Sequence, residues 1–288
     1  MMKPPRSHLL LEAGGIRVFH RPGRTGWTLV AFGPRQARPG DDRWWGATLG
    51  RREELDVIGV AATAHDWYPR DVMAEVLPAI RAAARPAILT YGYGMGGYAA
   101  LKYASALGAR GVIALSPQYS IDPADRTVGA RGMSHFDPVR HRDMRIMPGD
   151  YPDGAMLLWD PKARSDNRHA RAIARLPGIR PVRLRLAGHA MPAIFPETGR
   201  LVPVAEALLA GCPDDAVAGI RAARREAPSV LRAAASVLDA HGHPLWAAEA
   251  RRRAARRPTD DGHAIEARAR AFERSGDEAR ELAALREW

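Results

Sequence analysis

The sequence is poor in cysteine, in lysine and in long apolar runs. Cys212 is its single cysteine, which excludes an internal disulfide framework and a cysteine-rich metal site. Lysine is almost absent among the 43 Lys and Arg residues, so the net charge of +11 at pH 7 comes from arginine. No apolar run reaches transmembrane length, and the N-terminal run is too short for a secretory signal. We expect a cytoplasmic protein with no membrane association.

The arginine excess does not by itself predict nucleic-acid binding. The arginines come in pairs and triplets rather than in one long basic block, and acidic residues lie between them. Together with the abundant alanine, this pattern is typical of a compositional bias. We therefore expect no nucleic-acid partner. The 288 residues suffice for one large domain or two smaller ones with a buried core.

Strands and helices alternate along the first two thirds of the chain. Short apolar runs bounded by Gly or Pro predict buried strands, and apolar residues at helical spacing predict helices. This alternation indicates a parallel α/β sheet with right-handed crossovers. After a first strand or hairpin arm within 9–20, the predicted strands are 27–32, 56–62, 87–91, 111–116, 155–159 and 182–186, and the predicted helices are 72–84, 95–107, 166–176 and 199–210.

Residues 117–154 interrupt the alternation. This stretch is polar and rich in proline and has no convincing period. We expect it to run over the C-terminal edge of the sheet, either as a lid or specificity segment or as a plain surface insertion. From residue 213 onward the sequence contains only Ala- and Arg-rich helical segments.

The stretch 87–105 carries the most informative motif. A short apolar strand enters a glycine-rich corner, GYGMG from Gly92 to Gly96, and the chain continues directly into a helix. Small residues at such a corner let the helix pack closely on the strand, and glycine tolerates a strained backbone there. The order strand, turn, helix is that of a nucleophile elbow, G-x-S-x-G, with glycine in the place of serine.

Two nucleotide-binding motifs compete for the same stretch. Gly92, Gly94 and Gly97 match G-x-G-x-x-G in spacing, but no acidic residue ends a strand about 20 residues further on. A P-loop is excluded because the sequence has no GK[ST] at this turn. We favour the elbow, with the dinucleotide turn as the alternative.

The segment from Gly92 to Tyr103 resembles the elbow of the α/β-hydrolase superfamily, whose members are mostly esterases, lipases and acyl-transfer enzymes. The resemblance implies an α/β-hydrolase fold over residues 1–212, a small-molecule ester or acyl substrate, and neither a cofactor nor a metal. A small all-helical domain over 213–288 would follow, which resembles a degenerate pair of tetratricopeptide repeats. Two repeats are too few for a free solenoid, so we expect packing against the first domain, a homodimer or a protein partner.

The same resemblance implies a catalytic triad. The nucleophile position falls on Gly94, and the general base falls on His189, just past the last predicted strand. Two acids remain open. We favour Asp166, which could instead cap the following helix, over Asp160, which directly follows its strand and could form a turn.

The resemblance also implies an oxyanion hole and a substrate pocket. The donors would be the backbone N–H of Met95 and that of Gly33 or Arg35, because the proline between these two has no N–H. Phe32 and Tyr93 would line the substrate pocket.

Glycine at position 94 removes the attacking hydroxyl but not its partners. A triad without its nucleophile retains only about 10³–10⁴-fold catalysis over water. Two hypotheses follow: a serine hydrolase of ester or acyl substrates that is inactive or severely impaired, or a natural pseudoenzyme. The pseudoenzyme would bind a ligand or protein partner, or use His189 as a general base without a covalent intermediate. Arg35, Arg43, Trp44 and Trp45 could contact an acidic or sugar-like ligand.

Overall fold

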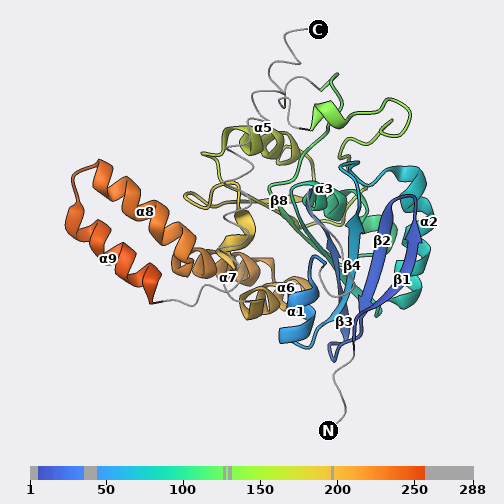
Figure 1. Cartoon of the computed structure of the whole chain (residues 1–288), viewed down its shortest axis with the longest axis horizontal. Coiled ribbons are helices and arrows are strands. Elements are labelled where there is room, and N and C mark those ends of the chain that lie inside the picture. Colours follow the sequence, from blue (N-terminus) through green and yellow to red (C-terminus); the bar gives the residue numbers. More distant parts are fainter. Residues whose placement is uncertain (1–5, 36–43, 126–127, 129–131, 196–197, 257–288) are drawn as a thin grey trace.

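The computed structural model describes residues 6–35, 44–125, 128, 132–195 and 198–256. Within these residues, eight strands form one sheet in the order β1-β2-β4-β3-β5-β6-β7-β8 (Figure 1). The β1–β2 and β2–β4 pairs are antiparallel, and the other pairs are parallel. The strands are β1 (His8–Ala13), β2 (Ile16–Arg21), β3 (Trp27–Phe32), β4 (Asp56–Ala62), β5 (Ala87–Tyr93), β6 (Gly111–Leu115), β7 (Ala155–Trp159) and β8 (Ile179–Arg183).

Helices cover both faces of the sheet. Successive strand residues point to opposite faces, so Val30 and Phe32 of β3 join one core cluster and Leu29 and Ala31 join the other. The first face packs against α2 to α5, and the second against α1, α6, α7 and the start of α8. The helices are α1 (Ala47–Arg52), α2 (Arg70–Ala83), α3 (Met95–Lys102), α4 (Ala104–Leu107), α5 (Arg164–Ile173), α6 (Leu201–Leu209), α7 (Pro213–Glu226), α8 (Pro228–Ala240) and α9 (Pro244–Ala255), with short 3₁₀ helices at Met133–His135, Met191–Ile194 and Thr198–Arg200.

The central strands are buried along their whole length. Every residue of β3 and β4 is buried, as expected for parallel strands that are covered on both faces. The predicted bounds of β3, β4 and β7 agree with the structure. The sequence thus predicts these strands correctly because continuous apolar runs leave little choice of structure.

The last strand lies three residues earlier than predicted, at β8 rather than over 182–186. Arg183 pairs with Trp159, the last residue of β7, so the neighbouring strand offers no later partner. The chain then turns, with Leu186 at a positive φ of 68°. The prediction failed because strand length depends on the neighbouring strand.

The predicted helix over 95–107 is two helices. Tyr103 separates α3 from α4 with a φ of −111° and a ψ of 5°. Its hydroxyl donates a hydrogen bond to the backbone carbonyl of Tyr68. The side chain is therefore fixed by a contact with a segment that is distant in sequence.

The second half of the 117–154 excursion is anchored to α3. The ammonium group of Lys102 lies 3.0 Å from Oδ2 of Asp150 and donates to the backbone carbonyl of Arg145 over 2.8 Å. Met144 and Ile146 are buried in the core cluster of the first face. This half of the excursion is part of the packed fold, and its role as a lid or specificity segment stays a prediction.

The helical segment after residue 212 is continuous with the sheet domain at its start. Ala216 and Ile220 of α7 belong to the core cluster of the second face, so no separate core begins at residue 213. Helices α8 and α9 form a hairpin that projects from the sheet domain (Figure 1) and buries its own small cluster around Ala235 and Ala247. Residues 257–288 of the predicted helical domain lie outside the described residues. Among the described residues, no helix is both long enough and apolar enough to cross a bilayer.

A buried carboxylate fixes the start of β4. Asp56 is 1% exposed, and its Oδ1 accepts a 2.6 Å hydrogen bond from the hydroxyl of Thr28. Its Oδ2 accepts one from the N–H of Gly23 over 3.2 Å, and Nε2 of His20 lies 3.4 Å from both oxygens. Burial would raise the pKa of Asp56, but the hydrogen bonds from His20, Thr28 and Gly23 outweigh it and hold the pKa below its usual value.

Asp56→Asn should lower the free energy of unfolding at pH 7 by about 1.5–3 kcal/mol, because Asn cannot accept on both sides. A carboxyl whose folded pKa is depressed adds stability above its unfolded pKa, about 3.9, and loses it as the pH falls through the folded pKa. The difference between the two proteins should therefore shrink below about pH 4. Urea unfolding at pH 7 and pH 3 measures it, with the exposed Glu75→Gln as the control. An equal difference at both pH values would contradict this account.

Candidate functional site

The elbow backbone is formed at Gly94. This residue precedes α3 with a φ of 56° and a ψ of −118°, a combination that strains any residue with a Cβ. Its N–H donates to the carbonyl of Leu115 over 2.9 Å, and its carbonyl accepts from the N–H of Tyr98 over 2.9 Å. The strand β5, the strained corner and α3 thus have the strand–turn–helix geometry of a nucleophile elbow.

Close packing leaves no room for a side chain at three glycines around the corner, but it leaves room at Gly94. A Cβ on Gly92 would lie 2.1 Å from the carbonyl oxygen of Gly96, and one on Gly96 would lie 2.1 Å from that of Phe32. A Cβ on Gly97 would lie 2.8 Å from the carbonyl oxygen of Leu115. These three glycines are required by close packing of backbone on backbone. At Gly94 a Cβ would meet no atom within 4 Å, so the space for a side chain is open.

His189 and Asp166 form a hydrogen-bonded pair. Nδ1 of His189 lies 2.7 Å from Oδ2 of Asp166, and the two side chains are 12% and 1% exposed. Asp166 lies in the first turn of α5, whose N-cap is Ala163, so Asp166 does not cap this helix. A carboxylate in this position favours the tautomer with the proton on Nδ1 and leaves Nε2 as a base.

Asp160 accepts hydrogen bonds from backbone N–H groups, whereas Asp166 contacts His189. Oδ1 of Asp160 accepts from the N–H of Lys162 over 2.8 Å, and its Oδ2 accepts from the N–H of Gly188 over 2.9 Å. It therefore links the end of β7 to the residue just before His189. Of the two acids that the sequence left open, the structure brings Asp166 to the histidine and uses Asp160 to hold the histidine loop.

Aromatic rings place His189 beside the elbow. The ring of Tyr93, the residue before Gly94, lies 5.1 Å from the ring of His189. The ring of Trp45 stacks on Tyr91 at 5.7 Å and lies 6.3 Å from Tyr93. These rings extend from β5 to the histidine, and the half-buried Tyr93 and Trp45 are in position to contact a bound molecule.

One backbone N–H and two side chains named from the sequence belong to the sheet and the core instead. The N–H of Gly33 donates to the carbonyl of Val60 over 2.8 Å, so it is not available to an oxyanion. Phe32 is 0% exposed and packs edge-on against Tyr68 at 5.5 Å, so it does not line a pocket. Trp44 is 7% exposed and stacks on Phe19. In each case the prediction was wrong because sheet pairing and packing, which the local sequence does not show, use these groups.

The remaining predicted donors lie at the ends of neighbouring strands. Met95 is the first residue of α3, directly after the corner. Arg35 follows β3, next to β5 in the sheet, and its guanidinium Nη1 lies 3.3 Å from Nε2 of His135. Met95 and Arg35 stay the predicted oxyanion donors. Arg43, which the sequence also named, lies outside the described residues.

A second cluster of rings at this edge was not predicted. His135, from the 117–154 excursion, lies 5.4 Å from the ring of His65 and 5.4 Å from that of Trp67, and it contacts Arg35. The excursion thus reaches the end of β3 beside the elbow strand. The sequence carries no local signal for this cluster, because its members come from three distant segments. Within the described ranges, no group of three or more His, Cys, Asp or Glu side chains is placed to hold a metal ion.

Ser116 does not replace the missing serine. The pairing of Tyr93 with Leu115 puts Ser116 next to Gly94 across the sheet, with a positive φ of 42°. Its hydroxyl is buried and has no hydrogen-bond partner among the described residues. No atom of Ser116 lies within 4 Å of a Cβ built on Gly94. A buried hydroxyl outside this space cannot take the position of the attacking group.

No protein-family model matches the chain, and no curated protein sequence matches it. Among solved structures, an α/β serine hydrolase without a lid from Xanthomonas campestris is 17% identical over 78% of this chain and 96% of its own, with a TM-score of 0.43. A Pyrococcus furiosus esterase is 13% identical over 70% of this chain and 94% of its own, with a TM-score of 0.45. The capsule O-acetyltransferase of Neisseria meningitidis serogroup A is 11% identical over 62% and 86%, with a TM-score of 0.45.

At these low identities, the likeness to these proteins concerns the fold alone. The sheet order, the helices on both faces and the elbow after β5 come from this chain itself. Together they are the features of an α/β-hydrolase fold.

Proposed function

We propose that this chain is an α/β-hydrolase-type protein for ester or acyl substrates in which glycine at position 94 has removed the covalent step. The observation that carries the proposal is the strained elbow backbone at Gly94, with open space for a side chain, beside the His189–Asp166 pair. Such a site would still bind and polarise an acyl group. Without a hydroxyl, it would form no acyl-enzyme.

The retained His189–Asp166 pair supports one second candidate. A protein that only binds a ligand has no need of a hydrogen-bonded, nearly buried histidine–carboxylate pair. His189 would then act as a general base on water, with the water in the space above Gly94 and no covalent intermediate. A loss of slow hydrolysis on changing His189→Ala in the otherwise unchanged protein would support this candidate.

The proposal extends to the helical tail and to the location of the protein. Helices α8 and α9 form a hairpin (Figure 1), and we propose that it is one tetratricopeptide-like unit. Leu245 and Trp246 of α9 are 83% and 72% exposed, which favours a protein partner or a second copy at this hairpin. The lone, exposed Cys212 is compatible with a reducing compartment such as the cytoplasm.

Gly94→Ser should restore ester hydrolysis. Completing the triad should raise the rate by at least about 10²-fold over the unchanged protein. The measurement is p-nitrophenol release from a panel of p-nitrophenyl acyl esters, with an initial burst as the sign of an acyl-enzyme. Gly94→Ala and the double variant Gly94→Ser with His189→Ala are the matched controls and should stay inactive. A folded but inactive Gly94→Ser would exclude the covalent origin of this site.

Substitutions of Asp166 and Asp160 should have different effects on kcat in the Gly94→Ser variant. Asp166→Asn leaves the shape of the pair but favours the wrong tautomer of His189, so kcat should fall by about 10³–10⁴-fold with little change in KM. Asp160→Asn keeps one acceptor for the histidine loop and should cost far less in kcat. Steady-state kinetics of both variants test the assignment. A larger loss of kcat for Asp160→Asn would reverse it.

The cost of a side chain at the corner should be backbone strain alone. Gly94→Ala and Gly94→Ser should each lower the free energy of unfolding by about 1–3 kcal/mol, because φ is positive while the space is open. Gly96→Ala should cost more than either, since its Cβ would overlap a backbone oxygen. Gly26→Ala, with open space and no positive φ, is the control and should change stability by less than about 1 kcal/mol. Denaturant unfolding measures all four, and a stabilised Gly94→Ala would contradict the strained corner.

A further inference from the structure

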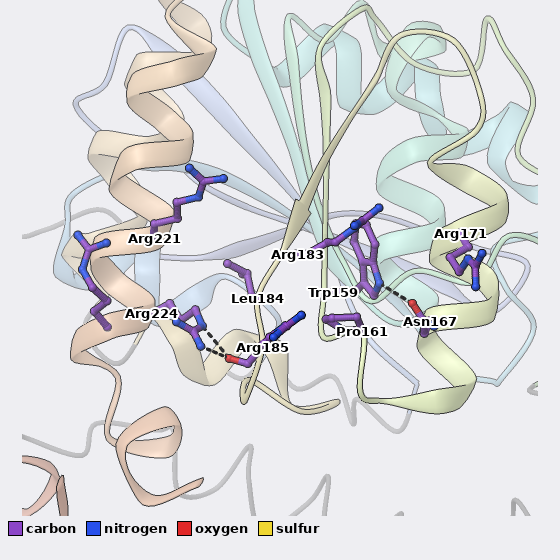
Figure 2. A pocket seen from close by; sticks show the side chains of 10 residues that line it. Trp159, Pro161, Asn167, Arg171, Arg183, Leu184, Arg185, Arg221 and Arg224 are labelled. Carbon is purple, nitrogen blue, oxygen red and sulfur yellow. Dashed lines mark hydrogen bonds between the residues drawn. The ribbon is translucent and has the colours of Figure 1, made fainter. Parts of the chain in front are cut away.

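A cleft of about 600 Å³ lies at the outer edge of the sheet, between α5, β8 and α7 (Figure 2). Neither Gly94 nor His189 lines it, so it is distinct from the elbow site. Its volume is in the range of about 300–1,000 Å³ that is typical of small-molecule sites.

Arginine dominates the lining of this cleft. Arg183 and Arg185 project from the end of β8, Arg171 projects from α5, and α7 contributes the others (Figure 2). The complete set of lining arginines is Arg171, Arg183, Arg185, Arg221, Arg224 and Arg225.

In the part of the chain that the structure describes, these arginines form no direct ion pair, although the carboxylate of Asp160 acts on Arg224 from a longer distance. No acidic residue lines the cleft. Among the described residues, no carboxylate lies within ion-pair distance of any of the six, whereas the nearby Arg180 and Arg200 pair with Asp214 and Glu226. Like charges gathered around one hollow repel each other and destabilise the folded state. An anion in the cleft would relieve this repulsion.

Two of the six guanidinium groups are held in place without a ligand. The guanidinium of Arg183 lies over the ring of Trp159 at 5.8 Å, and the indole N–H of Trp159 donates to Oδ1 of Asn167 over 3.0 Å. Nε of Arg224 donates to the backbone carbonyl of Arg185 over 2.7 Å. Burial lowers the pKa of Arg224, Asp160 opposes this and Arg225 adds to it, yet an arginine stays protonated at neutral pH. A site ordered before binding loses less entropy on binding.

We propose that this cleft binds a small polyanion in the form of a di- or triphosphate chain. Guanidinium groups pair with phosphate oxygens in a bidentate geometry, and six of them around one cleft match a ligand that carries several charges in a short length. A nucleic-acid strand would instead follow an extended basic stripe, and here the arginines face one concave site.

The cleft is next to the elbow site but does not depend on its chemistry. Its lining residues Pro161 and Asn167 directly follow Asp160 and Asp166, and Arg185 lies shortly before His189. A polyphosphate would therefore bind beside the first turn of α5, which carries Asp166, and beside the segment that leads to His189. Binding can be measured in the protein as it stands, whether or not Gly94→Ser is active.

The test is isothermal titration calorimetry of the full chain with inorganic tripolyphosphate at about 0.15 M salt, where surface attraction is largely screened. We expect saturable binding to one site. The variant Arg185→Gln/Arg221→Gln should weaken it at least tenfold. These two side chains have no hydrogen bond or ion pair within the described residues, so the variant should fold normally, which its thermal unfolding checks.

The control is Arg81→Gln/Arg110→Gln, which removes the same charge from exposed positions outside the cleft. It should change the affinity for tripolyphosphate by less than about twofold, because neither Arg81 nor Arg110 lines the cleft. Equal weakening by both variants would mean attraction to the net charge alone and would overturn the proposal. Absence of saturable tripolyphosphate binding, or saturable binding of an RNA oligonucleotide but not of tripolyphosphate, would overturn it as well.

Discussion

The contact between β5, α3 and the end of β3 leaves no room for side chains, and the site is built on it. Gly92 and Gly96 bring backbone onto backbone at distances that exclude a Cβ, and Gly96 packs on the carbonyl of Phe32. This packing forces the chain to turn within one residue, and Gly94 takes the strained conformation. Because the turn is required by its neighbours, it persists although position 94 has no hydroxyl.

The histidine and its acid are held by a separate set of contacts. Asp160 joins the end of β7 to Gly188, and Tyr93 reaches from β5 to the ring of His189. The nearly buried Asp166 then meets the histidine from α5. None of these contacts needs a serine at position 94, so the pair and the elbow can remain in register without the nucleophile. The strained corner and the histidine–carboxylate pair therefore lie close together without a hydroxyl at position 94.

Charge is distributed unevenly between the elbow site and the arginine cleft. The elbow is surrounded by Tyr93, Trp45 and the His189–Asp166 pair, whereas the neighbouring cleft is lined by arginines without acidic partners. Like charges gathered at one place repel each other and cost folding free energy, although five of these six arginines are solvent-exposed. Their concentration at one place in an arginine-rich chain is therefore better explained by an anionic ligand than by composition alone.

The sequence by itself determined the alternating strands, the elbow and the absence of its serine, because apolar periodicity and glycine sterics act over a few residues. It also named His189 and two possible acids. Only the tertiary structure brought Asp166, the acid that the sequence favoured, to His189, committed the N–H of Gly33 to Val60 and ended β8 at Arg183. The arginine cleft likewise unites α5, β8 and α7, which are distant in sequence. Which groups meet across such separations depends on how the packed layers align, and no local pattern encodes that.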